Sequence, residues 1–156
     1  MNIVNPKRIK HSYNQSLSAT PERVFPLLCP VLEEEWVPGW ETELVISKSG
    51  VAEKDCIFVT PAEPHSAIWL ITHYDPQAYT LEMYKVTPGH TVGKLEIALL
   101  ADGTDGTTAT VAYEYTALGP AGEDFLAGFT EARYGELMAK WEEALNHYLT
   151  SGEKIA

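Results

Sequence analysis

The alternation of hydrophobic and polar positions predicts β-strands through most of the chain. Leu95, Ile97 and Leu99, for example, alternate with Lys94 and Glu96. Hydrophobic residues at every second position place one face of a strand against a core and the other in water. Seven stretches separated by turn residues are predicted as strands on this basis or on their composition. They are Lys7–Ser18, Thr42–Lys48, Asp55–Thr60, Ser66–Tyr74, Ala78–Val86, Thr91–Ala101 and Thr107–Leu118.

The C-terminal part of the chain follows a different period, from Pro120 to about Thr150. Hydrophobic side chains recur there every three or four residues, which predicts one long α-helix with an apolar side. That side carries Leu126, Tyr134, Leu137, Met138, Trp141, Leu145 and Tyr148. Because a stripe of this width is unstable in water, we expect the predicted strands to cover it.

Two short helices are predicted between the first and second strands. Thr20 suits the N-cap position and Pro21 the first helical position, so a helix begins at Pro21. Pro26 and Pro30 keep this helix short, since proline lacks the N–H that a helix interior uses. Pro30 opens the second helix, and Pro38 ends it.

The connections between the predicted strands are short. A parallel pair of strands needs a crossover of a dozen or more residues, so we expect antiparallel neighbours. The order of elements then predicts an α+β fold in which a seven-stranded curved antiparallel sheet wraps around the long C-terminal helix, with two short helices after strand 1. The length suits a single domain over residues 1–156.

Several local strings in this order resemble the helix-grip superfamily called SRPBCC or START-like. They are Leu17-Ser18-Ala19-Thr20-Pro21-Glu22-Arg23-Val24-Phe25, Trp36-Val37-Pro38-Gly39-Trp40 and Trp141-Glu142-Glu143-Ala144-Leu145. The superfamily includes START lipid-transfer domains, the major birch pollen allergen and bacterial polyketide cyclase/dehydrases. The resemblance implies the helix-grip fold, and it implies a cavity for an apolar ligand between the sheet and the last helix. None of these strings is catalytic, so the resemblance implies no particular reaction.

Composition and charge narrow the choice of partners. The net charge of −11 argues against nucleic acid and anionic membranes as partners. No stretch approaches the ~18 apolar residues that span a bilayer, and the N-terminus lacks the apolar run of a signal peptide. Cys29 and Cys56 lie among apolar neighbours, which predicts two buried free thiols in a reducing compartment. We therefore expect a cytoplasmic protein.

A small-molecule site needs apolar walls with a few polar groups. The predicted inner faces of the sheet and the last helix offer such side chains, and tyrosine and tryptophan add a hydrogen-bonding group to a large apolar surface. The candidate ligand-binding residues are Tyr13, Phe58, Trp69, Met83, Leu95, Tyr113, Tyr115, Leu137 and Trp141. These side chains predict a protein that binds a small hydrophobic ligand of the lipid, polyketide or aromatic type. The alternative is that they pack against one another without leaving a space.

Acid–base catalysis is a second possibility. Cyclisation or dehydration of a polyketide-like substrate needs a proton acceptor near an acidic carbon and a donor to the enolate oxygen. The catalytic candidates are His73 paired with either Tyr13 or Tyr113. The strand Ser66–Tyr74 is apolar on both faces, so its pattern does not assign His73 to the cavity, and a lone histidine on a strand is usually structural. A third alternative is a ligand-free interaction module, with an exposed apolar patch and no cavity.

The remaining patterns indicate no metal site and no cofactor. The five histidines lie on separate elements without HxH or HExxH spacing, and there is no GxSxG or Walker A motif. The acidic run Glu33-Glu34-Glu35 predicts a solvated helix face, with two of the three carboxylates in water. A stripe of small residues on the last helix permits a homodimer contact or an ordinary exposed face. Its members are Gly128, Ala132, Gly135 and Ala139.

Overall fold

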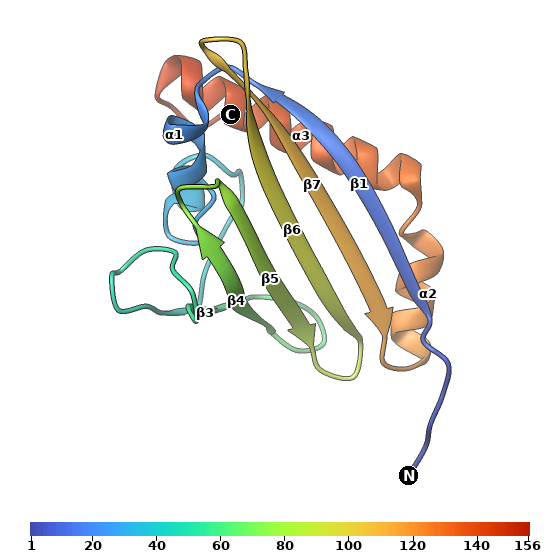
Figure 1. Ribbon diagram of the computed structural model, residues 1–156. Coiled ribbons are helices and arrows are strands. Elements are labelled where there is room, and N and C mark those ends of the chain that lie inside the picture. Colours follow the sequence, from blue (N-terminus) through green and yellow to red (C-terminus); the bar gives the residue numbers. More distant parts are fainter.

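A computed structural model describes residues 1–156, which form one antiparallel sheet with helices on one side (Figure 1). The strand order is β1-β7-β6-β5-β4-β3-β2, so every strand except the first follows its neighbour along the chain. The bounds are β1 (Arg8–Leu17), β2 (Leu44–Ile46), β3 (Ile57–Thr60), β4 (Ala67–Asp75), β5 (Thr80–Thr87), β6 (Thr91–Asp102) and β7 (Gly106–Ala117). The predicted seven-stranded antiparallel sheet is confirmed.

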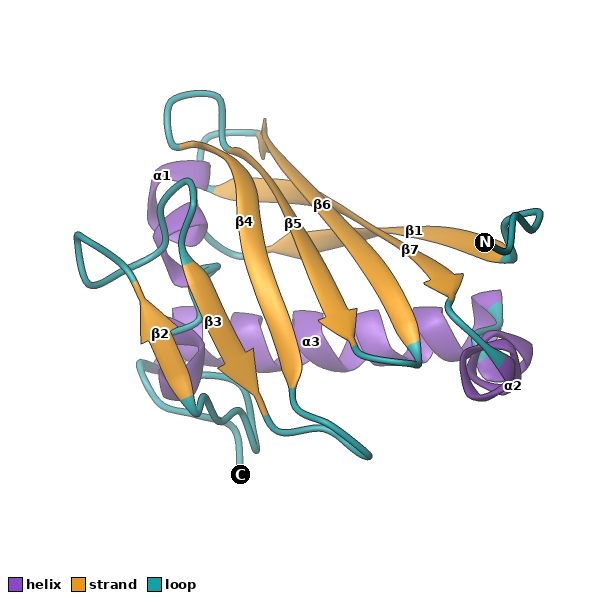
Figure 2. Ribbon diagram, turned by 90° about the horizontal axis from the view of Figure 1, so that it is seen from below, coloured by secondary structure: helices purple, strands orange, loops and turns teal.

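The helices lie at the start and at the end of the chain. The short α1 (Pro21–Val24) is followed by two 3₁₀ turns, Phe25–Leu27 and Leu32–Glu35. Two further helices, α2 (Pro120–Gly128) and α3 (Glu131–Ser151), close the chain. Figure 2 shows α3 running across the sheet, with α2 at one end of it and α1 at the other. This arrangement is the helix-grip fold that the sequence predicts.

The predicted C-terminal helix is broken into two. Phe129 leaves the helical conformation, with φ −85° and ψ 66°. Thr130 then caps α3, and its hydroxyl accepts a hydrogen bond from the backbone N–H of Arg133 at 3.2 Å. The prediction of one continuous helix was wrong because the hydrophobic period continues across Thr130, although threonine at an N-cap can start a new helix.

The core lies between the concave face of the sheet and α3. Ile71, Val111 and Leu145 are completely buried there. Polar groups also join the two layers, since the Gln15 side-chain amide donates to the Met138 carbonyl at 3.1 Å. A buried amide without a partner is destabilising, so this contact sets how β1 sits against α3.

The two cysteines and the acidic run have the burial that the sequence predicts. Cys29 and Cys56 are buried and free, as predicted. In the acidic run, Glu34 and Glu35 are exposed while Glu33 is buried. No helix is both long and apolar enough to cross a membrane.

Candidate functional site

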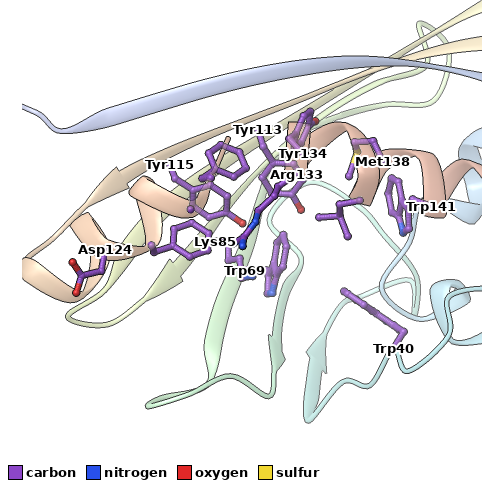
Figure 3. Close-up of a pocket in the computed structure, with 14 residues that line it drawn as sticks. Trp40, Trp69, Lys85, Tyr113, Tyr115, Asp124, Arg133, Tyr134, Met138 and Trp141 are labelled. Carbon is purple, nitrogen blue, oxygen red and sulfur yellow. The ribbon is translucent and has the colours of Figure 1, made fainter. Parts of the chain in front are cut away.

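A cavity of about 560 Å³ lies between the sheet and the helices α2 and α3 (Figure 3). Ten of its 14 lining residues are hydrophobic. In Figure 3 Trp40 lies at one end and Asp124 at the other. The lining residues are Trp40, Trp69, Lys85, Tyr113, Tyr115, Asp124, Phe125, Gly128, Phe129, Arg133, Tyr134, Leu137, Met138 and Trp141. Volume and lining both fall within the usual range of small-molecule sites.

Aromatic rings form one wall of the cavity. Tyr113 and Tyr115 of β7 stack with their ring centroids 5.6 Å apart, and Phe125 meets the Tyr115 ring edge-on at 4.8 Å. Gly93, the cross-strand partner of Tyr115 on β6, makes this arrangement possible. A Cβ atom at Gly93 would lie only 2.8 Å from Tyr115 Cε1, so any larger residue displaces the ring.

The three tyrosines of the cavity differ in their hydrogen bonds. Tyr134 donates from its hydroxyl to the Val111 carbonyl at 2.6 Å, whereas the hydroxyls of Tyr113 and Tyr115 make no such hydrogen bond within the protein. Burial raises the pKa of Tyr115 to about 12. Burial, helped by the neighbouring Tyr115 and Glu33, raises the pKa of Tyr113 well above its ordinary value. Both groups therefore stay protonated at neutral pH, and both can donate a hydrogen bond to a bound molecule.

Lys85 brings a positive charge into this apolar space. It lies on β5 opposite Trp69 of β4, and its Nζ atom is 4.9 Å from the centroid of the Trp69 ring. The ring face attracts the ammonium group electrostatically. Burial nevertheless lowers the pKa of Lys85, because the half-buried ammonium group is less well solvated than it would be in water.

The helices form the opposite wall. Leu137 is 58% exposed although it lines the cavity, so it lies where the cavity opens to solvent. Trp141 is turned inward, and its ring packs 5.2 Å from that of Trp36, which is completely buried. Arg133 also lines the cavity from the first turn of α3.

Several predicted ligand-binding residues line this cavity and others do not. Those that line it are Trp69, Tyr113, Tyr115, Leu137 and Trp141. Phe58 lies behind the wall, where its ring stacks on Trp69 at 5.2 Å. Met83 and Leu95 are buried in the core, and the Tyr13 hydroxyl donates to Glu142 at 3.2 Å.

The sequence reasoning missed Lys85 and Arg133. Lys85 occupies an inner-face position within a hydrophobic alternation, since Leu81 and Met83 precede it at two-residue spacing. That charge at a core position was the available signal. Arg133 carried no such signal, because an arginine in the first turn of a helix usually points into water.

His73 lies outside the cavity, on the outer face of the sheet. The pairing of β4 with β5 shifts by one residue between Ile71 and His73, so a β-bulge reverses the faces from that point. His73 is exposed, and its Nε2 atom lies 2.8 Å from the Thr80 hydroxyl. The geometry therefore does not support an acid–base pair of His73 with Tyr113 or Tyr13.

The small residues predicted to form one stripe on the last helix lie in different environments. Gly128 lines the cavity, whereas Ala132 and Ala139 are exposed. A Cβ atom at Gly135 would meet nothing within 4 Å. A homodimer through this stripe stays a prediction. No group of three or more His, Cys, Asp or Glu side chains is placed to hold a metal ion.

Comparisons with known proteins define the fold. No family model and no curated protein matches the sequence. Truncated norcoclaurine synthase from Thalictrum flavum is 14% identical, with a TM-score of 0.68 over 97% of this chain and 99% of that one. A START superfamily protein from Mycobacterium smegmatis is also 14% identical, with a TM-score of 0.60 over 88% and 94%.

A third similar structure is Ara h 8.0201, which is 12% identical with a TM-score of 0.59 over 92% of this chain and 99% of that one. The predicted resemblance to the START-like superfamily is thus confirmed for the helix-grip fold. At these identities the similarity establishes the fold alone, and function follows from the chemistry of the cavity.

Proposed function

We propose that this protein reversibly binds a small hydrophobic molecule, aromatic in part, in the cavity between the sheet and the helices α2 and α3. The observation that carries this proposal is a cavity of about 560 Å³ that opens to solvent at Leu137 and lies beside a fully formed core. Protein interiors are normally close-packed, and an unfilled space of this size loses dispersion contacts that a ligand restores.

The character of the lining supports an aromatic ligand. Tyr115, Phe125 and Trp69 line the cavity with aromatic rings on which a planar ligand can stack. The free hydroxyls of Tyr113 and Tyr115 add hydrogen-bond donors that would orient the ligand. Norcoclaurine synthase, which shares this fold, has been solved in complex with dopamine and hydroxybenzaldehyde, two small aromatic compounds.

Tryptophan fluorescence tests the proposal directly. Three of the four tryptophans, Trp40, Trp69 and Trp141, line the cavity, so a bound aromatic molecule should quench their emission. A ligand at ~100 times its Kd should also stabilise the fold by about 2.7 kcal/mol. For a chain of this length that corresponds to a rise in Tm of about 5 to 11 °C.

A variant at the opening locates the binding. Leu137→Trp narrows the exposed end of the cavity and should weaken binding, while Ala139→Trp, on the exposed side of the same helix, should not. The proposal fails if a panel of lipids and aromatic compounds changes neither the fluorescence nor the Tm, or if both variants bind as the unaltered protein does.

A second candidate is an enzyme of the polyketide cyclase/dehydrase kind. Lys85 favours it, because it lies in an apolar cavity where burial lowers the pKa of its ammonium group, and a lowered pKa makes proton transfer from this group easier. The assay is incubation with an aromatic β-diketone and detection of a dehydrated or cyclised product by mass spectrometry. Conversion that is lost in Lys85→Met would support an enzyme, and binding without conversion would support a carrier or sensor.

A ligand-free interaction module has less support. Exposed hydrophobic side chains such as Leu44, Ile46 and Ile68 do occur on β2 and β4. However, the module predicts a solid interior, and the cavity contradicts that requirement.

A further inference from the structure

Two positive side chains in the cavity have no acidic partner. The chain carries 22 acidic residues and 11 basic ones, and only four of the basic ones make salt bridges. All five salt bridges of the structure are made by Lys7, Arg8, Lys10 and Lys94. Lys85 and Arg133 take part in none of them, although both line the cavity.

The two side chains belong to opposite walls. Lys85 lies on the sheet, where its Nζ atom contacts the Trp69 ring at 4.9 Å. Arg133 reaches from α3 toward the sheet (Figure 3). Its guanidinium lies against Gly128, since a Cβ atom there would be 3.2 Å from Nη1. A side chain at position 128 would crowd this guanidinium at the cavity wall.

The one acid of the lining does not neutralise them. Asp124 lies on α2 at the opposite end of the cavity from Trp40, and Figure 3 shows its carboxylate turned away from the other lining side chains. It makes no salt bridge with Lys85 or Arg133. Lys85 is half-buried beside the Trp69 ring, which solvates an ammonium group less well than water does, whereas Arg133 is exposed.

We infer that the cavity selects acidic ligands: a small molecule with an aromatic or aliphatic body and one carboxylate, held between Lys85 and Arg133. This inference rests on the proposed function and specifies its ligand class. The planar guanidinium can bind a carboxylate with two parallel hydrogen bonds, and the ammonium adds a third charged donor. The apolar body of the ligand then lies against Tyr115 and Phe125.

Selectivity follows from the half-buried ammonium group of Lys85. A neutral ligand of the same shape excludes water from Lys85 without providing a counter-charge, which leaves a buried charge unpaired. A carboxylate supplies that counter-charge. Hydrogen bonds to charged groups are worth enough to make the neutral analogue bind about 10- to 100-fold more weakly.

The test compares pyrenebutanoic acid with pyrenebutanol, two fluorescent probes that differ only at the polar end. Anisotropy titration should give the acid a Kd about 10- to 100-fold lower than the alcohol. Lys85→Met and Arg133→Gln should each remove most of that difference by weakening the acid alone. Lys54→Met and Lys140→Gln remove the same charge from exposed positions and should leave the difference unchanged.

The outcomes separate this inference from the proposed function. Equal binding of acid and alcohol by the unaltered protein overturns the selectivity for acids and leaves ligand binding intact. Failure of both probes to bind overturns the inference about acidic ligands, and the panel of lipids and aromatic compounds then decides the proposed function separately. The acid–alcohol comparison needs no substitution, so it decides the matter even if Lys85→Met does not fold.

Discussion

Glu33 makes the stability of the fold depend on pH in a way that one substitution should abolish. Its side chain is only 9% exposed, on the 3₁₀ turn Leu32–Glu35. Burial raises the pKa of Glu33 from 4.5 to about 8, with no hydrogen bond or opposite charge to offset it. We predict that Glu33→Gln, which keeps the shape and removes the ionisable group, stabilises the protein at alkaline pH.

The direction and size of this change in the free energy of unfolding follow from proton linkage. Below pH 4.5 both the folded and the unfolded chain hold the Glu33 proton, so the group has no effect on stability. Between 4.5 and about 8 the unfolded chain loses this proton while the folded chain keeps it, so stability falls as pH rises. From about pH 5 to about pH 8.5 the loss amounts to about 4 kcal/mol, at about 1.36 kcal/mol for each pKa unit.

The assay is urea unfolding of both proteins at intervals over that pH range. The free energy of unfolding of Glu33→Gln minus that of the unaltered protein should increase by about 4 kcal/mol, or about 8 to 16 °C in Tm. Glu34→Gln, on the same turn but exposed, is the control and should give a nearly flat difference. If the Glu33→Gln difference is equally flat, Glu33 is ionised at neutral pH and the interior is wetter than described.

Three further substitutions test the packing that forms the cavity, each by urea unfolding. Leu145→Ala leaves a space in the completely buried contact of α3 with the sheet and should cost about 2 to 5 kcal/mol; a cost below ~1 kcal/mol would contradict this packing. Gly93→Ala should cost about 1 to 3 kcal/mol and shift the Tyr115 ring, which near-ultraviolet circular dichroism would detect. Thr130→Ala removes the cap of α3 and should cost about 1 kcal/mol, whereas Thr150→Ala near its C-terminal end should cost less.

Much of the architecture was readable from the sequence, because it depends on local patterns. Alternation along the strands and short turns between them predict the antiparallel sheet, and the period of three to four residues predicts the helix that it grips. Pro21 after Thr20 marks the start of α1 correctly. The break at Thr130 was missed, since the hydrophobic period runs through it and only backbone geometry ends α2.

The chemistry of the cavity was decided by tertiary structure. His73 was a candidate on its residue type, but one inserted residue in β4 turns it to the outer face. Glu33 belongs to an acidic run that reads as a solvated surface, yet packing places this one carboxylate in the interior. Lys85 and Arg133 are 48 positions apart in the sequence, and only the docking of α3 on the sheet brings them to one space. The hydrophobic periodicity of a helix or strand indicates which of its faces is buried. The direction and the partners of a charged side chain depend instead on neighbours that are distant along the chain.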